Sequence, residues 1–308
     1  MSKVTVIGSI GGDVVAVADH HPGAGETVHG SEVHYFPGGK GANQALAAAL
    51  AGSPTRIAGR VGRDAAGQTQ RQLFASAAID DSAVITSQDA PTQTAIIVVD
   101  AHGENRIVVV GGASATVTPD DIGTLQYEPG EVVVAQFEIP QATVMAAFTA
   151  AHSAGAITVL NPAPAMAMTE GLAELVDILV VNESETSLLS GRQLAPDAPV
   201  DAVIAVAETL RCRVDQTVVV TLGARGVVAL TDSGPITVAG HTVDVVDTTG
   251  AGDCFAGYLA SGIARGQTIG TALEFANCAA AVCVQRLGAG SSMPARADVA
   301  AFSDGQKV

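Results

Sequence analysis

The chain has 308 residues and a formal net charge of −16, because 31 acidic residues outnumber 15 Lys and Arg. Such a surface repels nucleic acid and anionic membranes, so neither is an expected partner, and any phosphate site has to be a local exception. Hydrophobic residues make up 48% of the chain and aromatic residues only 3%, which predicts a core of Ala, Val, Leu and Ile. We expect one α/β unit over residues 1–308.

The N-terminal part predicts short strands, loops and two helices. One helix is expected to begin at Lys40, and a second, capped by Asp64, to run through about Ala78. Residues 9–12 are expected to form a turn and residues 20–27 a loop. The predicted strands are residues 3–8, 28–36, 55–58 and a hairpin of 94–100 with 106–110. These hairpins do not fit the pattern that follows, so we expect a small appendage on the main sheet.

From Glu131 onward, strand and helix patterns alternate, which predicts a parallel sheet with helices on both faces. The predicted strands are residues 132–135, 157–160, 178–181 and 218–222, and the helices between them are 141–153, 183–189 and 200–211. A strand-like run at 242–246 precedes helices over 252–265 and 268–286, and a short helix follows Pro294.

Cysteine and histidine usage favours a reducing compartment and gives no metal motif. The four cysteines, Cys212, Cys254, Cys278 and Cys283, form no C-x-x-C pair, and we expect all four to be buried thiols. His20 and His21 are expected in solvent, and no histidine spacing suits a metal. No signal peptide or membrane-spanning run is visible, which predicts the cytoplasm.

The most informative stretch is Asp247-Thr248-Thr249-Gly250-Ala251-Gly252-Asp253, at the start of a predicted helix. Gly250 and Gly252 allow close approach of the backbone to a ligand, and a helix start offers unpaired N–H groups and a partial positive charge. Asp253 stands where an anion would bind. An acid there favours phosphoryl transfer to a hydroxyl, with the carboxylate accepting the proton; an ordinary turn with Asp253 as an N-cap is the alternative.

Other polar residues follow strands at the edge where α/β sheets bind ligands. They are Asp13, Lys40, Asn43, Glu138, Asn182, Glu185 and the turn 221–226. Each alone also fits a turn residue, a helix cap or a surface carboxylate. Together, Asp13, Asn43 and Glu138 suit a polyhydroxylated substrate, and the glycine-rich turns after Thr221 and Thr249 suit a nucleotide.

Two common nucleotide motifs are excluded. Gly41, rather than Ser or Thr, follows Gly39-Lys40, so no Walker-type P-loop is present. The first turn, residues 8–12, does not give G-x-G-x-x-G, which argues against a dinucleotide site and an NAD-linked oxidoreductase.

Five stretches of the sequence together match one known family. The two longest are GGKGANQALAAALAG at 38–52 and DTTGAGDCFAGYLASG at 247–262, and the shorter ones are GETV at 25–28, NPAPA at 161–165 and TLGARG at 221–226. On these residues the chain resembles the ribokinase-like (PfkB) carbohydrate kinases over nearly its full length. The resemblance implies a three-layer α/β/α sandwich with a mostly parallel sheet of the nine-stranded type. It also implies a small β lid, about 12–37 and 92–112, through which a homodimer forms.

The resemblance also implies residue roles, ATP as cosubstrate, and conversion of D-ribose to D-ribose 5-phosphate. Asp253 is the implied general base, with an anion hole from Gly250, Ala251 and Gly252. The implied sugar contacts are Asp13, Gly39, Lys40, Asn43, Glu138 and Asp253, and the implied nucleotide contacts are Asn182, Thr221, Gly223, Gly226, Gly252 and Asn277. Glu185 would hold the water shell of Mg²⁺, and a K⁺ ion would lie at Asp247, Thr249, Cys283, Arg286, Gly288 and Ser292.

One departure affects the expected substrate. Ribose-specific members carry Asn-x-Asp after the first strand, whereas this chain has Gly11-Gly12-Asp13. Loss of that amide implies weaker ribose binding or a bulkier substrate. A kinase for another sugar or a nucleoside is therefore the alternative. A non-catalytic sugar- or nucleotide-binding regulator is a further one, although Asp253 and the anion hole are intact. Asn277 also replaces a frequent His, a change expected to touch only adenine packing.

Overall fold

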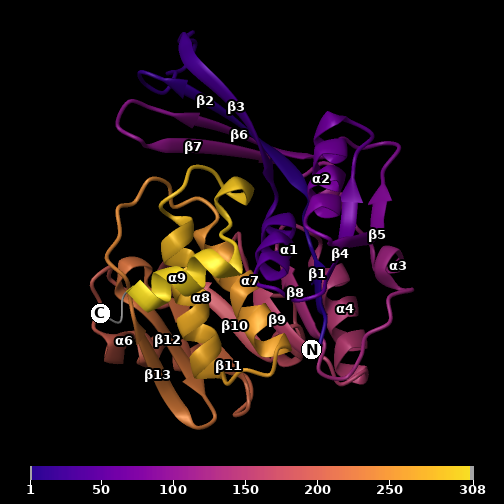
Figure 1. Cartoon of the computed structure of the whole chain (residues 1–308), viewed down its shortest axis with the longest axis vertical. Coiled ribbons are helices and arrows are strands. Elements are labelled where there is room, and N and C mark those ends of the chain that lie inside the picture. Colours follow the sequence, from indigo (N-terminus) through magenta and orange to yellow (C-terminus); the bar gives the residue numbers. More distant parts are fainter. Residues whose placement is uncertain (1, 306–308) are drawn as a thin grey trace.

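A nine-stranded sheet forms the centre of the molecule, in the order β13-β12-β11-β10-β9-β8-β1-β4-β5 (Figure 1). The computed structural model describes residues 2–305, so part of the expected unit 1–308 lies outside the described residues. The strands are β1 Val4–Ile7, β4 Thr55–Val61, β5 Asp80–Thr86, β8 Val132–Gln136, β9 Ile157–Asn161, β10 Ile178–Asn182, β11 Thr217–Thr221, β12 Gly226–Thr231 and β13 Gly234–Ala239. All neighbours pair in parallel except β11 with β12 and β12 with β13. The predicted mostly parallel sheet is confirmed.

Helices cover both faces of this sheet, and each face has its own hydrophobic core. One layer contains α1 Lys40–Leu50, α2 Ala65–Ser76, α7 Ala251–Ala264, α8 Ile269–Cys283 and α9 Arg296–Gly305. The other contains α3 Pro119–Ile122, α4 Gln141–Ser153, α5 Glu183–Ser190 and α6 Val200–Ala207. The three-layer α/β/α sandwich is therefore confirmed.

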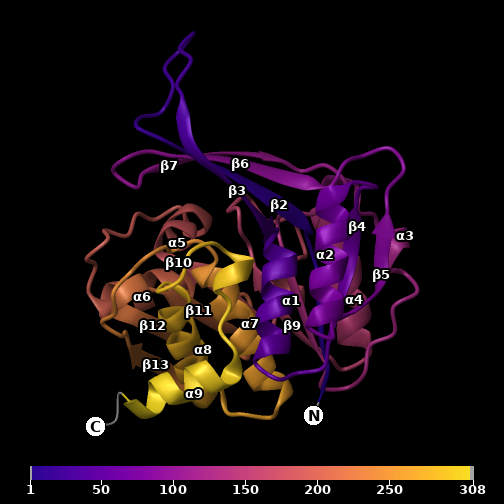
Figure 2. The ribbon, with the colours of Figure 1, turned by 45° about the horizontal axis from the view of Figure 1, so that its top comes forward.

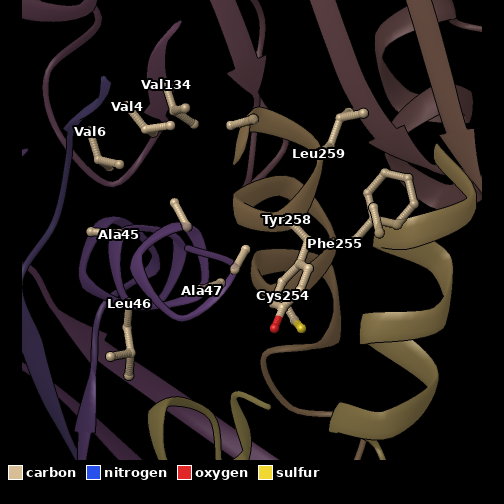
Figure 3. Packing of buried hydrophobic residues seen from close by; sticks show 14 of the residues in the cluster. Val4, Val6, Ala45, Leu46, Ala47, Val134, Cys254, Phe255, Tyr258 and Leu259 are labelled. Atoms are coloured by element: carbon tan, nitrogen blue, oxygen red, sulfur yellow. The ribbon is translucent and has the colours of Figure 1, made fainter. Parts of the chain in front are cut away.

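Helices α1 and α7 approach each other closely because small residues line their contact (Figure 3). A Cβ at Gly257 would lie 2.5 Å from the carbonyl oxygen of Gln44, so only glycine fits there. Tyr258 is fully buried in this layer, and its hydroxyl donates to the carbonyl of Pro294 at 2.8 Å. This packing brings the N-terminal turns of α1 and α7 side by side.

A separate four-stranded sheet, which we call the lid, projects from the body in the order β3-β2-β6-β7 (Figure 2). Its strands are β2 Gly11–Ala18, β3 Gly30–Gly38, β6 Gln93–Val99 and β7 Asn105–Val110. The β6–β7 hairpin is antiparallel, as predicted. Strands β2 and β3 also pair antiparallel, whereas β2 and β6 pair in parallel. The expected small appendage is confirmed.

Several local predictions were wrong. Residues 242–246 form no strand; instead, Val246 and Asp247 donate backbone hydrogen bonds to the carbonyl of Val284 at 2.8 and 3.1 Å. The predicted turn at 9–12 is too long, since β2 begins at Gly11. Strands β5 and β13 were not predicted, because their alternating burial gives short, mixed patterns.

Two side chains are also placed differently from expectation. Cys212 is exposed, because it follows a short 3-10 helix at the surface and not a core strand; the other three cysteines are buried. His21 is largely buried 3.6 Å from Asp100, while its neighbour His20 is exposed. Across residues 2–305, no helix combines the length and the apolarity that a membrane crossing requires.

Candidate active site

Two cavities adjoin at the carboxyl ends of the central strands. The larger, of about 440 Å³, lies under the lid and is lined by residues that include Asp13, Asn43 and Glu138. The smaller, of about 220 Å³, is lined by residues that include Asn182 and Thr221. Lys40, Gly250 and Asp253 line both cavities, so they mark the point where the two meet.

Asp253 is fixed at this junction by two amides near the N-terminus of α1. Its carboxylate accepts hydrogen bonds from Asn43 Nδ2 at 3.0 Å and Gln44 Nε2 at 2.9 Å. The residue is only 6% exposed, and this burial raises the pKa of Asp253, although Lys40 and the two amides oppose the shift. A carboxylate with a raised pKa accepts a proton more readily at neutral pH, as a general base requires.

Lys40, the first residue of α1, lies among four carboxylates. Asp253 raises the pKa of Lys40, burial opposes this, and Glu138, Glu185 and Asp13 add to the increase. The lysine therefore stays protonated. It supplies the positive charge that an anionic phosphate needs inside a strongly acidic protein.

Asp13 and Glu138 face the larger cavity from the lid and the body. Burial raises the pKa of Asp13 to about 6, with added repulsion from Glu138 and Asp253 and opposition from Lys40. No described residue donates a hydrogen bond to the Asp13 carboxylate. Glu138 Oε2, in contrast, accepts from Ser9 Oγ at 2.5 Å, the Lys40 backbone N–H at 3.1 Å and Gln93 Nε2 at 2.9 Å.

The start of α7 has open space beside its backbone. Gly250 adopts a left-handed φ of 78°, as the glycine in this turn allows. A Cβ added at Gly252 would meet no atom within 4 Å, so this position faces empty space. The Ala251 N–H already donates to the carbonyl of Thr248 at 3.2 Å. In the described chain, the Gly252 N–H has no such acceptor, which leaves it available to an anion.

The residues expected at the nucleotide fall into two groups. Asn182 caps α5, because its Oδ1 accepts from Glu185 N at 2.8 Å while Glu185 Oε2 accepts from Asn182 N at 2.9 Å. Burial raises the pKa of Glu185. Both residues have this structural role and, with Thr221, also line the smaller cavity.

Three expected nucleotide residues do not line either cavity. Gly223 begins the short 3-10 helix between β11 and β12, and Gly226 follows it. A Cβ at Gly226 would lie 2.1 Å from the carbonyl oxygen of Val238, so strand packing already requires this glycine. Asn277 donates to the carbonyl of Ala239 at 2.8 Å and so ties α8 to β13.

The six residues expected at K⁺ lie in two segments held together by Asp247, the loop before α7 and the segment from the end of α8 to a short 3-10 helix at Gly290–Ser292. Its Oδ1 accepts from the Thr249 N–H at 2.9 Å and hydroxyl at 2.6 Å, and its Oδ2 accepts from Gly288 N at 2.9 Å. Burial opposes the shift, but these hydrogen bonds lower the pKa of Asp247. Cys283 Sγ lies 3.0 Å from Ser292 Oγ, and Arg286 pairs with Asp298 at 2.9 Å. Within residues 2–305, no three His, Cys, Asp or Glu side chains cluster to suit a metal.

Sequence reasoning missed the amides around the catalytic candidates. Gln44 bonds Asp253 and also bonds Asn161 Oδ1 at 3.2 Å, while Gln136 Nε2 donates to Gln44 Oε1 at 2.6 Å. Gln44 lies within the motif at 38–52 and Asn161 within the motif at 161–165, so their place in these motifs could have indicated a role. Gln93, a lone polar residue at the start of β6, gave no signal.

Comparisons with known proteins agree with this geometry. The family model described as pfkB family carbohydrate kinase matches residues 1–296. The chain belongs to this family. It is 36% identical over 297 residues to a ribokinase of Staphylococcus aureus, covering 95% of this chain and 97% of that protein.

Two solved structures show the same fold. A ribokinase from Thermotoga maritima superposes with a TM-score of 0.87 and 33% identity, covering 99% of this chain and 100% of its own. The Arabidopsis thaliana ribokinase complexed with ribose and ATP superposes with a TM-score of 0.86 and 30% identity, covering 98% of this chain and 99% of its own. The chain is thus an ATP-dependent carbohydrate kinase.

Proposed function

We propose that this kinase transfers the γ-phosphoryl group of ATP to D-ribose and forms D-ribose 5-phosphate. The observation that carries the proposal is the pair of cavities that meet at Lys40, Gly250 and Asp253. A sugar in the larger cavity and a triphosphate in the smaller would place the reacting hydroxyl and phosphate on either side of Asp253. Such positioning is the main requirement of phosphoryl transfer.

In this proposal Asp253 is the general base. Its carboxylate takes the proton of the sugar hydroxyl while the oxygen attacks the γ-phosphorus and ADP leaves. Asn43 and Gln44 hold the carboxylate in place. The first turn of α7 stabilises the charge on the transferred group, chiefly through the Gly252 N–H, with Gly250 and Ala251 shaping the turn. Lys40 neutralises part of the phosphate charge.

The sugar contacts follow from the larger cavity. Asp13, whose carboxylate no described residue engages, accepts hydrogen bonds from sugar hydroxyls, and Glu138 does the same. Gly39 and Asn43 complete the proposed sugar site. Because Gly11 carries no amide, a panel of sugars has to decide between ribose and the alternative of another sugar or a nucleoside.

The proposed nucleotide site extends from the smaller cavity. Asn182 and Thr221 line it beside the triphosphate, and Gly223, Gly226 and Asn277 lie towards the proposed adenine end. Mg²⁺ is usually held by one or two carboxylates together with phosphates, and the partly exposed Glu185 fits that role through water. A kinase that uses ATP works where ATP is made, so we propose a cytoplasmic location.

A monovalent cation, K⁺, is proposed beside the anion hole. The hydrogen bond from Gly288 N to Asp247 joins the two segments whose carbonyl groups would be its ligands, and the one from Thr249 N orders the Asp247 turn. Arg286 could contribute only its backbone carbonyl, because its guanidinium is a cation without an acceptor and pairs with Asp298. Bound K⁺ would supply positive charge next to the start of α7.

We also propose a single catalytic unit with lid segments at about 12–37 and 92–112, and a homodimer formed through the lid. Large apolar side chains are exposed there, including Val33, Tyr35, Ile96 and Val108. An apolar patch on an exposed sheet is typical of an interaction surface.

The test of the proposed function is ADP release from ATP, Mg²⁺ and K⁺ with a panel of pentoses, hexoses and nucleosides. We expect ribose to give the highest kcat/KM, with ribose 5-phosphate as the product by mass spectrometry. A higher value for another compound would overturn the ribose assignment, and no turnover with any compound would overturn the activity.

A further inference from the structure

Gln93 is a buried polar residue at the junction of lid and body. It is the first residue of β6, is only 3% exposed and lines the larger cavity. Its Nε2 donates to Glu138 Oε2 at 2.9 Å, so the hydrogen bond links the lid sheet to a carboxylate of the body. The amide of Gln93 must point its NH₂ group at Glu138, because the reverse orientation would place the amide oxygen against a carboxylate oxygen, and both are acceptors.

The other end of the amide has no partner. Gln93 Oε1 is buried and accepts no hydrogen bond from any described residue. An unsatisfied buried oxygen is destabilising, and an apolar side chain of the same shape would avoid that cost. The Oε1 end of the amide therefore does not explain a glutamine here, whereas the hydrogen bond from Nε2 to Glu138 does.

Gln93 also explains the missing side chain at Gly11. The two residues are direct neighbours in the parallel pairing of β2 with β6. A Cβ added at Gly11 would lie 3.0 Å from the carbonyl oxygen of Gln93 and 3.2 Å from its Cβ and Cγ. Such contacts are tighter than most packed Cβ atoms make, so a neighbouring atom would have to shift by a few tenths of an ångström. The Gln93 side chain thus uses the space into which a side chain at position 11 would extend.

We propose that Gln93 is a specificity-determining residue of the sugar pocket, which acts by holding Glu138 and by replacing a side chain at Gly11. It is a positioning residue, because it works through Glu138. Glu138 Oε2 receives three hydrogen bonds, and the one from Gln93 is its only link to the lid among the described residues. The inference rests on the proposed function, since it assigns the larger cavity to the sugar.

The first test replaces Gln93 by methionine, which keeps the length of the side chain without its amide. We expect KM for the sugar to rise about 10- to 100-fold, because Glu138 loses a charge-assisted hydrogen bond. KM for ATP should stay within about twofold, and the melting temperature should not fall, since the unpaired oxygen is also removed.

A matched control is Gln216→Met. Gln216 is also a buried glutamine, but its Nε2 donates to the carbonyls of Ala173 and Val176, away from both cavities. We expect this variant to lose stability and keep its sugar KM. The two variants should therefore show opposite patterns of stability and sugar affinity.

The second test is a double-mutant cycle of Gly11→Asn and Gln93→Gly. Gln93→Gly should lower kcat/KM for the sugar in the wild-type background. It should raise kcat/KM in the Gly11→Asn background, because it removes two of the three close contacts, those with Cβ and Cγ, and leaves only the contact with the backbone carbonyl oxygen. Melting curves and ATP binding identify variants that do not fold. Turnover of the wild type is measured first, on the panel above, and the sugar with the highest kcat/KM is used throughout.

The outcomes separate the two hypotheses. A wild type that phosphorylates nothing overturns the proposed function and, with it, this inference. An active wild type with sugar KM unchanged in Gln93→Met, or with Gln93→Gly acting by the same factor in both backgrounds, overturns the Gln93 inference alone. A raised sugar KM together with the reversed sign in the cycle supports it.

Discussion

The body buries its central functional residue, whereas the lid exposes large apolar side chains. In the body, Asp253 is 6% exposed and fixed by two amides, and the start of α7 is packed against α1. In the lid, apolar side chains stand in solvent, with Tyr35 75% and Val108 62% exposed. The body presents a preorganised site, whereas the lid exposes apolar surface of the kind that proteins use for contacts with partners.

The largest effect is expected from Asp253→Asn, which tests the preorganised site of the body. The substitution keeps the shape of the side chain and removes the base, so we expect kcat to fall about 10²- to 10⁴-fold. ATP affinity, measured by calorimetry, should change little, because the smaller cavity is otherwise intact. Turnover close to the wild-type rate would refute the assignment of Asp253 as the base.

The anion hole is tested by Gly252→Ala. An added methyl meets no protein atom, so folding should not suffer, but it would enter the space proposed for the phosphate. We expect kcat/KM for ATP to fall about 10- to 100-fold, which is the range of losing one oxyanion donor or less. The melting temperature should stay the same or rise, since alanine favours helices.

Gly270→Ala is the matched control for this variant. Gly270 is the second residue of α8, as Gly252 is of α7, and its Cβ would also meet open space. We expect full activity and equal or higher stability. If both variants lose activity to the same degree, the loss reflects helix geometry and not the phosphate site.

The lid is tested by Val108→Glu. A charge in the exposed apolar surface of β7 should weaken the proposed dimer at least tenfold, as measured by sedimentation equilibrium. Val214→Glu is the control, because Val214 is 81% exposed but lies outside the lid. Equal dissociation constants for the two variants would place the dimer contact elsewhere.

The smallest expected effect is a change in stability on substitution of Asp13, the residue of β2 that faces the larger cavity. Its pKa of about 6 lies above the ordinary value of 3.8 for an aspartate, so the folded state disfavours the charged form. The stability that this group contributes is present below about pH 4 and is lost as the pH rises through about 6. Asp13→Asn should thus be about 1–3 kcal/mol more stable than the wild type at pH 8 and no more stable at pH 4.

Chemical denaturation at both pH values measures this difference. The same variant should bind the sugar more weakly, since Asp13 is a proposed hydroxyl acceptor. If the difference in stability between Asp13→Asn and the wild type is the same at pH 4 and pH 8, burial of the Asp13 charge does not destabilise the folded protein.

Much of the fold and of the site could be predicted from the sequence, because local patterns decide them. Strand–helix alternation gave the parallel sheet, and the two glycine motifs located Lys40 and Asp253. The amides of Gln44, Gln93 and Asn161 were missed, since their roles depend on partners far away in the sequence, such as Glu138 for Gln93. The run at 242–246 has strand-like residues but no neighbouring strand to pair with, which no local pattern reveals.

The most direct test of the central claim asks whether the two cavities hold their ligands at the same time. Ribose is titrated calorimetrically into the wild-type protein saturated with a non-hydrolysable ATP analogue and Mg²⁺. Two adjoining cavities predict one ribose per chain, bound at least as tightly as without the analogue. Loss of ribose binding when the analogue is present would mean that the ligands compete for one cavity, and would contradict the account.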